Sequence, residues 1–455
     1  MAADRSRLPA LGPEPAFRFP AIAKARIDGG LDCWTIEHHA VPVVVFLLLL
    51  PVGAAADPPD RPGLAALVGD MLDEGAGALD ALEFHDALAR AGAHLEIDVG
   101  PDATTLTLWT LARNAGRALA LLGDAVARPR LSPADFERVR TLRLNRLRQL
   151  RDLPPAVADQ LFARTLYRGH PYGHLPIGTE AALRAMSLDD AAAFHRTWYG
   201  PARATLIAAG DIDQATLERE ARRVFESWDG PTVAPLADPA ILPVPDPPAG
   251  RLFVVDRPGS AQSEFRIGHV AAPRRTPDYH SLLVLNTLLG GQFVSRINMN
   301  LREEKGYTYG ARSAFDFRRG PGPFVVQASV QTDATAEAVR ETLGELAAVR
   351  GDRPPTPEEL ALARAALTRG YPRGFETAEQ IARAAAQLAL YELPDDYFSQ
   401  FVPRVAAVTA DDVSRAARRH LDPARALVLV VGDRRRVETP LAALGLGDPV
   451  ALSLP

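Results

Sequence analysis

The chain has 455 residues, of which 47% are apolar and 24% charged, and its formal net charge is −5 at pH 7. This length exceeds one ordinary hydrophobic core, so two or more domains are expected, and the lack of a basic excess argues against a nucleic-acid partner. Cys33 is the single cysteine, which excludes an internal disulfide and a cysteine-rich metal site.

The chain begins with an expected arm and two expected strands. Residues 1–20 have no apolar stretch of the kind found in a signal peptide, so they are expected to form an arm. Residues 21–52 predict two strands. The second contains VPVVVFLLLL (41–50), which is too short to span a bilayer as a helix and is typical of a buried strand. No membrane anchor is expected, and the cytoplasm is the default location.

Helices and a hairpin are expected next. Periodicity and capping residues predict an apolar helix at 64–72, a helix at 81–91, a hairpin of 93–99 with 103–111, helices at 115–127 and from Ser132 to about Leu150, a helix after Ser187 and a strand at 204–209. The loop 170–174 holds two histidines four residues apart, but a proline and a glycine between them prevent a helix from aligning them. A structural loop is therefore favoured over a metal site.

A proline-rich linker divides the chain into two related halves. Seven prolines lie between Gly230 and Gly250, which predicts a stiff connection. Residues 186–211 align without gaps with residues 408–433, at a shift of 222 residues. Each copy predicts a capped helix, a turn and a buried strand that ends in Gly-Asp, so we expect a duplicated domain of the α/β or α+β class.

The most informative stretch is LGGQFVSRINMNLREEKGYTY (289–309). A glycine pair ends one apolar helix, a second helical segment carries Arg296 and Arg302, and Gly306 precedes a strand that includes Tyr309. An arginine and a tyrosine at a helix-to-strand transition can bind a peptide, although this pair alone is a weak signal.

Familiar catalytic motifs do not occur in the sequence. It contains neither HExxH nor HxxEH, no G-x-S-x-G elbow and no phosphate-binding loop. Carboxylate pairs such as Asp73-Glu74 and Glu303-Glu304 are adjacent residues that point apart on a helix, so they are interpreted as solvated faces.

From about Ala21 to Leu446 the chain resembles the pitrilysin/insulinase metallopeptidases, the inverted zincins. The resemblance rests on several pieces in order: VPVVVF, AAADPPDRPGLAAL, HPYGHLPIGTEAAL, the two Gly-Asp strand ends, the linker and LLGGQFVSRINMNLREEKGYTYG. It implies halves 21–229 and 251–446, each a mixed or mostly antiparallel sheet with helices packed on one face. The linker 230–250 would join them, and residues 447–455 would form a tail.

The zinc-binding residues of that family are missing. The resemblance places HxxEH on the helix after Gly63, where this chain has Ala66, Gly69 and Asp70, and places a further carboxylate on the next long helix, where it has Arg146. Alanine and glycine offer no ligand, and a cationic helix repels a divalent cation. No metal is therefore expected in this chain.

The resemblance implies that Arg302 and Tyr309 act at a zinc site, often one held by another chain. We therefore expect a non-catalytic subunit that binds peptide substrates together with an HxxEH-containing homologue, as a heterodimer or a dimer of heterodimers, with zinc in the partner. One alternative is a purely structural paralogue. A weaker alternative is an autonomous metallopeptidase that uses Asp70, Asp73 and Glu74.

One hypothesis concerns the residues that replace the ligands. A carboxylate buried without a partner is costly. We therefore expect Asp70 to pair with Arg143 or Arg146, so that a guanidinium replaces zinc as the bridge between the two helices.

Overall fold

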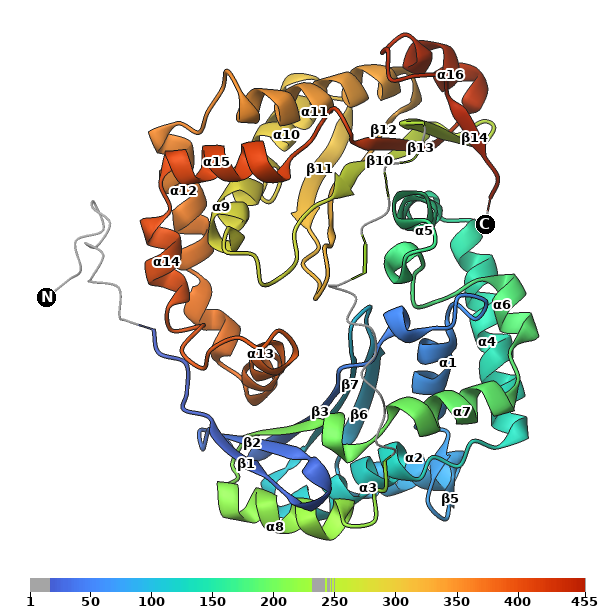
Figure 1. The fold of residues 1–455 in the computed structure, drawn as a ribbon, viewed down its shortest axis with the longest axis vertical. Coiled ribbons are helices and arrows are strands. Elements are labelled where there is room, and N and C mark those ends of the chain that lie inside the picture. Colours follow the sequence, from blue (N-terminus) through green and yellow to red (C-terminus); the bar gives the residue numbers. More distant parts are fainter. Residues whose placement is uncertain (1–16, 231–241, 244–245, 247, 249, 455) are drawn as a thin grey trace, which may run out of the picture.

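The computed structural model describes residues 17–230, 242–243, 246, 248 and 250–454, and most of these residues belong to two lobes, each built on a six-stranded sheet (Figure 1). The predicted arm 1–20 and linker 230–250 fall mostly outside the described residues. Within the described ranges, no helix is both long enough and apolar enough to cross a membrane.

The first sheet has the strand order β1-β2-β8-β3-β7-β6. Only the β2–β8 pair is parallel. Its strands are β1 (Ala23–Arg26), β2 (Asp32–Glu37), β3 (Val43–Leu50), β6 (His94–Val99), β7 (Thr104–Leu111) and β8 (Thr205–Gly210), and β4 (Gly75–Ala76) pairs with β5 (Leu79–Asp80) outside the sheet. The helices of this half are α1 (Leu64–Met71), α2 (Ala81–Arg90), α3 (Ala115–Ala127), α4 (Pro133–Arg151), α5 (Pro154–Tyr167), α6 (Glu180–Ala185), α7 (Leu188–Trp198) and α8 (Gln214–Phe225).

The second sheet has the order β11-β12-β10-β13-β9-β14. Its strands are β9 (Leu252–Asp256), β10 (Gln262–Val270), β11 (Thr308–Phe315), β12 (Pro323–Gln331), β13 (Leu427–Gly432) and β14 (Val450–Leu452). The helices of this half are α9 (Tyr279–Leu289), α10 (Arg296–Asn298), α11 (Thr335–Arg350), α12 (Pro357–Thr368), α13 (Ala378–Leu390), α14 (Phe401–Ala407), α15 (Ala410–His420) and α16 (Arg434–Ala442).

The two halves repeat the same arrangement, as predicted. Helix α7 and strand β8 correspond to α15 and β13 at the predicted shift of 222 residues. Within the expected tail 447–455, Val450–Leu452 forms β14 and pairs in parallel with β9.

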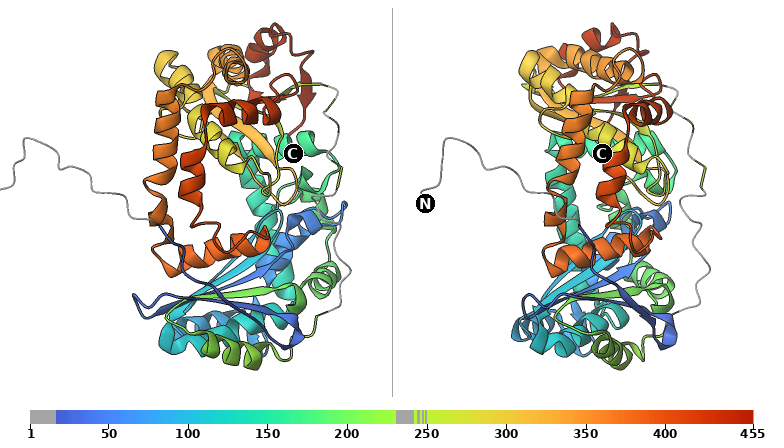
Figure 2. Two further views of the ribbon diagram at one scale, coloured as in Figure 1. Left: turned by 60° about the vertical axis from the view of Figure 1, so that its left-hand side comes forward. Right: turned by 90° about the vertical axis from the view of Figure 1, so that its left-hand side faces the viewer.

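The apolar run in β3 is continuous because both faces of the strand are buried. Val44, Phe46 and Leu48 belong to a core shared with the helices of the first half. Val45, Leu47 and Leu49 point to the opposite face, where they pack against α13 of the second half. Figure 2 shows α13 lying over the first sheet.

The second sheet is covered in the reciprocal way. Val428 and Val430 of β13 face the helices of the second half. Leu427 and Leu429 pack against Leu161 and its neighbours in α5, which belongs to the first half. Each sheet therefore has its own helices on one face, as expected, and a helix from the other half on its second face, which was not expected.

A polar junction also joins the halves. The Tyr172 hydroxyl donates to Asp102 at 2.6 Å, and the backbone N–H of Arg319 donates to the other oxygen of that carboxylate at 2.8 Å. The Tyr167 hydroxyl donates to the carbonyl of Pro321 at 2.8 Å. Because Asp102 is buried, its pKa is raised.

Candidate functional site

Helix α1 begins where an aspartate and a histidine brace it. Asp57 accepts hydrogen bonds from the backbone N–H groups of Gly63 and Ala65, both at 2.6 Å. The Nε2 atom of His174 lies 2.9 Å from the same carboxylate. His170 turns elsewhere, since its Nδ1 accepts from the backbone N–H of Tyr172 at 3.1 Å. These contacts agree with a structural role for the loop 170–174.

The first two of the three predicted zinc positions on α1, Ala66 and Gly69, carry no ligand, and the second also has no space for one. Ala66 and Gly69 are both buried. A Cβ atom added to Gly69 would lie only 2.7 Å from Cγ2 of Val99 on β6. The edge strand β6 therefore lies so close to α1 that a glutamate side chain does not fit at position 69.

The third position, Asp70, is held by an arginine. Its Oδ2 accepts a hydrogen bond of 2.6 Å from Nη1 of Arg143 on α4, while Nη2 of Arg143 donates to the carbonyl of Pro176 at 2.7 Å. The expected bridge between the two helices is therefore present. Arg143 provides it, and Arg146, one turn further along α4, is exposed.

The neighbouring carboxylates do not gather around a common point. Glu74 forms an ion pair with Arg138, and Asp73 lies 3.9 Å from Nε2 of His85. Burial, and then the charge of Glu74, raises the pKa of Asp73. Among the described residues, no group of three or more His, Cys, Asp or Glu side chains is arranged to hold a metal ion. The residues present do not fit zinc, and the alternative site of Asp70, Asp73 and Glu74 has no supporting geometry.

Arg302 lies on a π-helical turn, Met299–Glu304, that follows α10. Such turns carry an extra residue per turn and often occur at functional sites. The guanidinium of Arg302 stacks over the ring of Phe293, 4.5 Å from its centre, and its Nε lies 3.1 Å from Glu303. Gly306 ends the segment with φ = 65°, a left-handed conformation that favours glycine.

Tyr309 lies at the start of β11, an edge strand of the second sheet. The pairing of β11 with β12 moves from Thr308–Val330 to Ala311–Ala328, so the strand has one extra residue here. Such a bulge changes the direction of a side chain. The Tyr309 side chain is 89% exposed.

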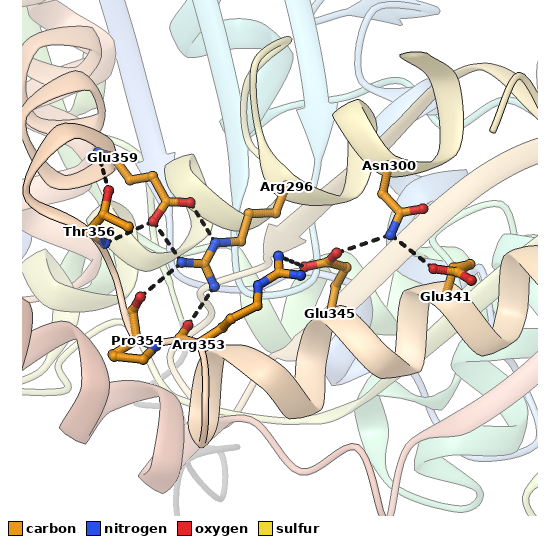
Figure 3. A network of polar contacts seen from close by, with 8 residues as sticks. All are labelled: Arg296, Asn300, Glu341, Glu345, Arg353, Pro354, Thr356 and Glu359. Carbon is orange, nitrogen blue, oxygen red and sulfur yellow. Dashed lines mark hydrogen bonds and ion pairs between the residues drawn. The ribbon is translucent and has the colours of Figure 1, made fainter. Parts of the chain in front are cut away.

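A buried polar network fixes the segment that carries both residues (Figure 3). Arg296 donates to both carboxylate oxygens of Glu359, at 2.7 and 2.6 Å, and to the carbonyls of Arg353 and Pro354. The amide of Asn300 donates to Glu345 at 3.0 Å. Arg296 is thus a structural residue, and of the two arginines in the stretch only Arg302 is partly open to solvent.

Comparison with known families agrees with this arrangement. Residues 34–180 match the insulinase family (peptidase family M16), and residues 185–367 match the peptidase M16 inactive domain. The chain belongs to the insulinase family. Within this family, the chain is a member that lacks the HxxEH motif.

Relatives named as zinc proteases align with most of the chain. An uncharacterized zinc protease of Streptomyces coelicolor is 24% identical over 87% of this chain and 86% of its own length. One of Mycobacterium tuberculosis is 25% identical over 92% of this chain and 95% of its own length.

Solved structures share the fold. A peptidase M16 inactive domain from Pseudomonas fluorescens has a TM-score of 0.84 at 23% identity, over 90% of this chain and 98% of that one. A protease from Helicobacter pylori has a TM-score of 0.85 at 20% identity, over 91% of this chain and 100% of that one.

Three features of this insulinase-family site were not predicted from the sequence: the Asp57 brace, the closure of Val99 onto Gly69 and the anchoring of the segment through Arg296. Each depends on residues far apart in the chain. Only the glycine at position 69 gave a local signal, because glycine within a helix often marks a close approach.

Proposed function

We propose that this chain is the non-catalytic subunit of a heterodimeric zinc metallopeptidase and that it contributes Arg302 and Tyr309 to a site whose zinc is held by an HxxEH-containing homologue. One observation carries the proposal. At the positions expected for zinc ligands, Val99 packs against Gly69 and Arg143 pairs with Asp70. Tyr309, in contrast, is exposed, and Arg302 is partly exposed on a rigidly anchored segment.

Arg302 is suited to holding a peptide. Its planar guanidinium can donate two parallel hydrogen bonds to a carboxylate, or a hydrogen bond to a carbonyl oxygen. The ring of Phe293 supports one face of the group and limits its freedom. Less conformational entropy is then lost when a substrate binds.

Tyr309 is suited to stabilising negative charge. Its hydroxyl can donate to the substrate carbonyl as the oxygen becomes anionic, and one such donor contributes roughly 3 kcal/mol to the transition state. Zinc bound by the partner would supply the activated water. A peptide lying along a sheet edge as an added strand would bring its carbonyls within reach.

The experiment compares the isolated chain with the assembled pair. Alone, the chain is expected to bind no stoichiometric zinc and to hydrolyse no peptide, while mixing it with an HxxEH homologue from the same genome produces activity. Stoichiometric zinc and peptide hydrolysis in the isolated chain would overturn the proposal.

Substitutions then separate a contributing subunit from a scaffold. Arg302→Ala and Tyr309→Phe are each expected to lower kcat/KM of the pair about 100-fold without changing assembly. Arg340→Ala, on the outer helix α11 and exposed, is the matched control and leaves kcat/KM unchanged. Unchanged kinetics in both test variants would leave only the structural paralogue.

A further inference from the structure

A cavity lies between the two halves, and neither Arg302 nor Tyr309 lines it. Its volume is about 440 Å³, within the usual range of small-ligand sites. Leu47, Leu49 and Thr105 line it from the inner face of the first sheet, and Arg274, Gln387 and Tyr391 line it from the second half. We call it the Arg274 cavity. Figure 1 shows α13, which contributes to its wall, facing β3 and β7.

Arg274 is an unusual residue for such a position because it is only 4% exposed and yet lines the cavity. Its guanidinium lies 3.7 Å from the ring centre of Tyr279, 4.8 Å from that of Tyr397 and 5.6 Å from that of Tyr391. No carboxylate of the described residues forms an ion pair with it. Buried cations are normally paired, because removing a charge from water is expensive.

The aromatic rings compensate for only part of that cost. Cation–π contacts stabilise the flat faces of a guanidinium, but its N–H groups lie in the plane and still need acceptors. The nearby Tyr397 hydroxyl is neutral and supplies no counter-charge, and burial raises its pKa further, to about 12. The other buried arginines of the described residues differ, since Arg143, Arg266 and Arg296 each form an ion pair with a carboxylate.

The second arginine of the cavity is already neutralised. Arg383 pairs with Glu379 on its own helix and with Glu96 on β6, both at 2.9 Å. Asp98 also lines the cavity, on the exposed side of β6. The positive charge without a carboxylate partner is therefore that of Arg274, and apolar side chains such as Leu47 and Leu390 line the same cavity.

We propose that the Arg274 cavity binds the carboxylate of a peptide, with the carboxylate oxygens accepting from the in-plane N–H groups of Arg274 and the adjoining side chain packed on the apolar wall. The choice of a peptide rests on the proposed function, whereas the carboxylate chemistry rests on Arg274 alone. The carboxylate comes either from the peptide C-terminus or from an acidic side chain.

The test measures binding to the isolated full chain by calorimetry, so it needs neither zinc nor a partner. The probes are tetra-alanine with a free C-terminus, tetra-alanine amide, and an amidated, N-acetylated alanine peptide with one central glutamate. A C-terminal site binds the first and not the second, and a side-chain site binds the third. Failure of all three to bind would overturn the proposal while leaving the heterodimer untouched.

Two substitutions and a control identify the cavity. Arg274→Met is expected to weaken binding about 10- to 100-fold, the effect of one lost charge-assisted interaction. Thr105→Glu leaves Arg274 in place but adds a carboxylate to the cavity that competes with the ligand for Arg274, so it is expected to abolish binding. Arg404→Met, an exposed arginine 5.9 Å from the Tyr397 ring, leaves affinity unchanged.

The stability of the free chain gives an independent readout. An arginine kept for a ligand costs stability in the absence of that ligand, so Arg274→Met is expected to keep or raise the melting temperature. Unchanged affinity in both Arg274→Met and Thr105→Glu would overturn the proposal. A marked fall in melting temperature for Arg274→Met, together with full binding in Thr105→Glu, would do so as well and would make Arg274 a structural residue.

Discussion

Replacing Asp70 by asparagine is expected to lower the free energy of unfolding by about 1–2 kcal/mol, because it leaves the Arg143 guanidinium without its charged partner. The structure sets this magnitude. The Arg143 side chain is only 9% exposed, whereas that of Asp70 is 48% exposed. The pair therefore lies between a surface ion pair, worth about 0.2–1 kcal/mol, and a fully buried one, whose disruption costs about 3–5 kcal/mol.

A double-mutant cycle isolates the interaction itself. Arg143→Met removes the charge and also leaves the carbonyl of Pro176 without its donor, so its cost alone is not the energy of the pair. Combined with Asp70→Asn it is expected to cost about 1 kcal/mol less than the sum of the single changes. The matched control is Asp86–Arg90 on α2, whose side chains are 70% and 71% exposed and whose coupling is expected to be about 0.3–0.5 kcal/mol.

The assay is equilibrium urea unfolding followed by both circular dichroism and tryptophan fluorescence. Coincident transitions establish that a two-state fit applies. A coupling energy for Asp70–Arg143 no larger than that of the control pair would refute the reasoning. The guanidinium would then fill the place of the metal without joining α1 to α4.

Three further outcomes are expected. Gly69→Glu lowers the free energy of unfolding by about 1–3 kcal/mol, because the added Cβ lies 2.7 Å from the Val99 side chain. Adding Val99→Ala restores most of that stability. An equal loss in the double variant would contradict a clash with Val99. Burial, with Arg404 and Arg274 nearby, lowers the pKa of His280 from 6.5 to about 4, so its contribution to stability is complete above pH 6.5 and is lost as the pH falls towards 4. That loss, about 2 kcal/mol after allowance for solvent access, is absent in His280→Phe, and identical pH profiles of urea stability in the two proteins would disprove it. Ile381→Ala on α13, fully buried against the first sheet, costs about 2–5 kcal/mol by the same assay, and a cost below 1 kcal/mol would show that the contact between the halves is not tightly packed.

The sequence predicted the features that depend on residues close together in the chain. Capped helices, the Gly-Asp strand ends and the apolar run in β3 follow from short-range patterns, and the repeat follows from comparing the chain with itself. The absence of zinc ligands was also readable, because Ala66 and Gly69 have no donor atoms whatever the fold.

Other features depend on distant partners. Arg143 and Arg146 lie three residues apart on α4 with the same side chain, so only the approach of α1 decides which of them meets Asp70. Strand β14 has three residues, too few for a periodic signal. Helices α5 and α13 have apolar faces, but nothing in an apolar face specifies which sheet it will cover.

The reciprocal placement of α5 and α13 suggests how this architecture can arise and how it resists separation. Two identical single-repeat chains that exchanged this helix would form a domain-swapped dimer, and joining their genes would give the present connectivity. Neither half then covers both faces of its own sheet. Cutting the linker should therefore yield two fragments that stay associated, because each supplies the helix that covers the other's sheet.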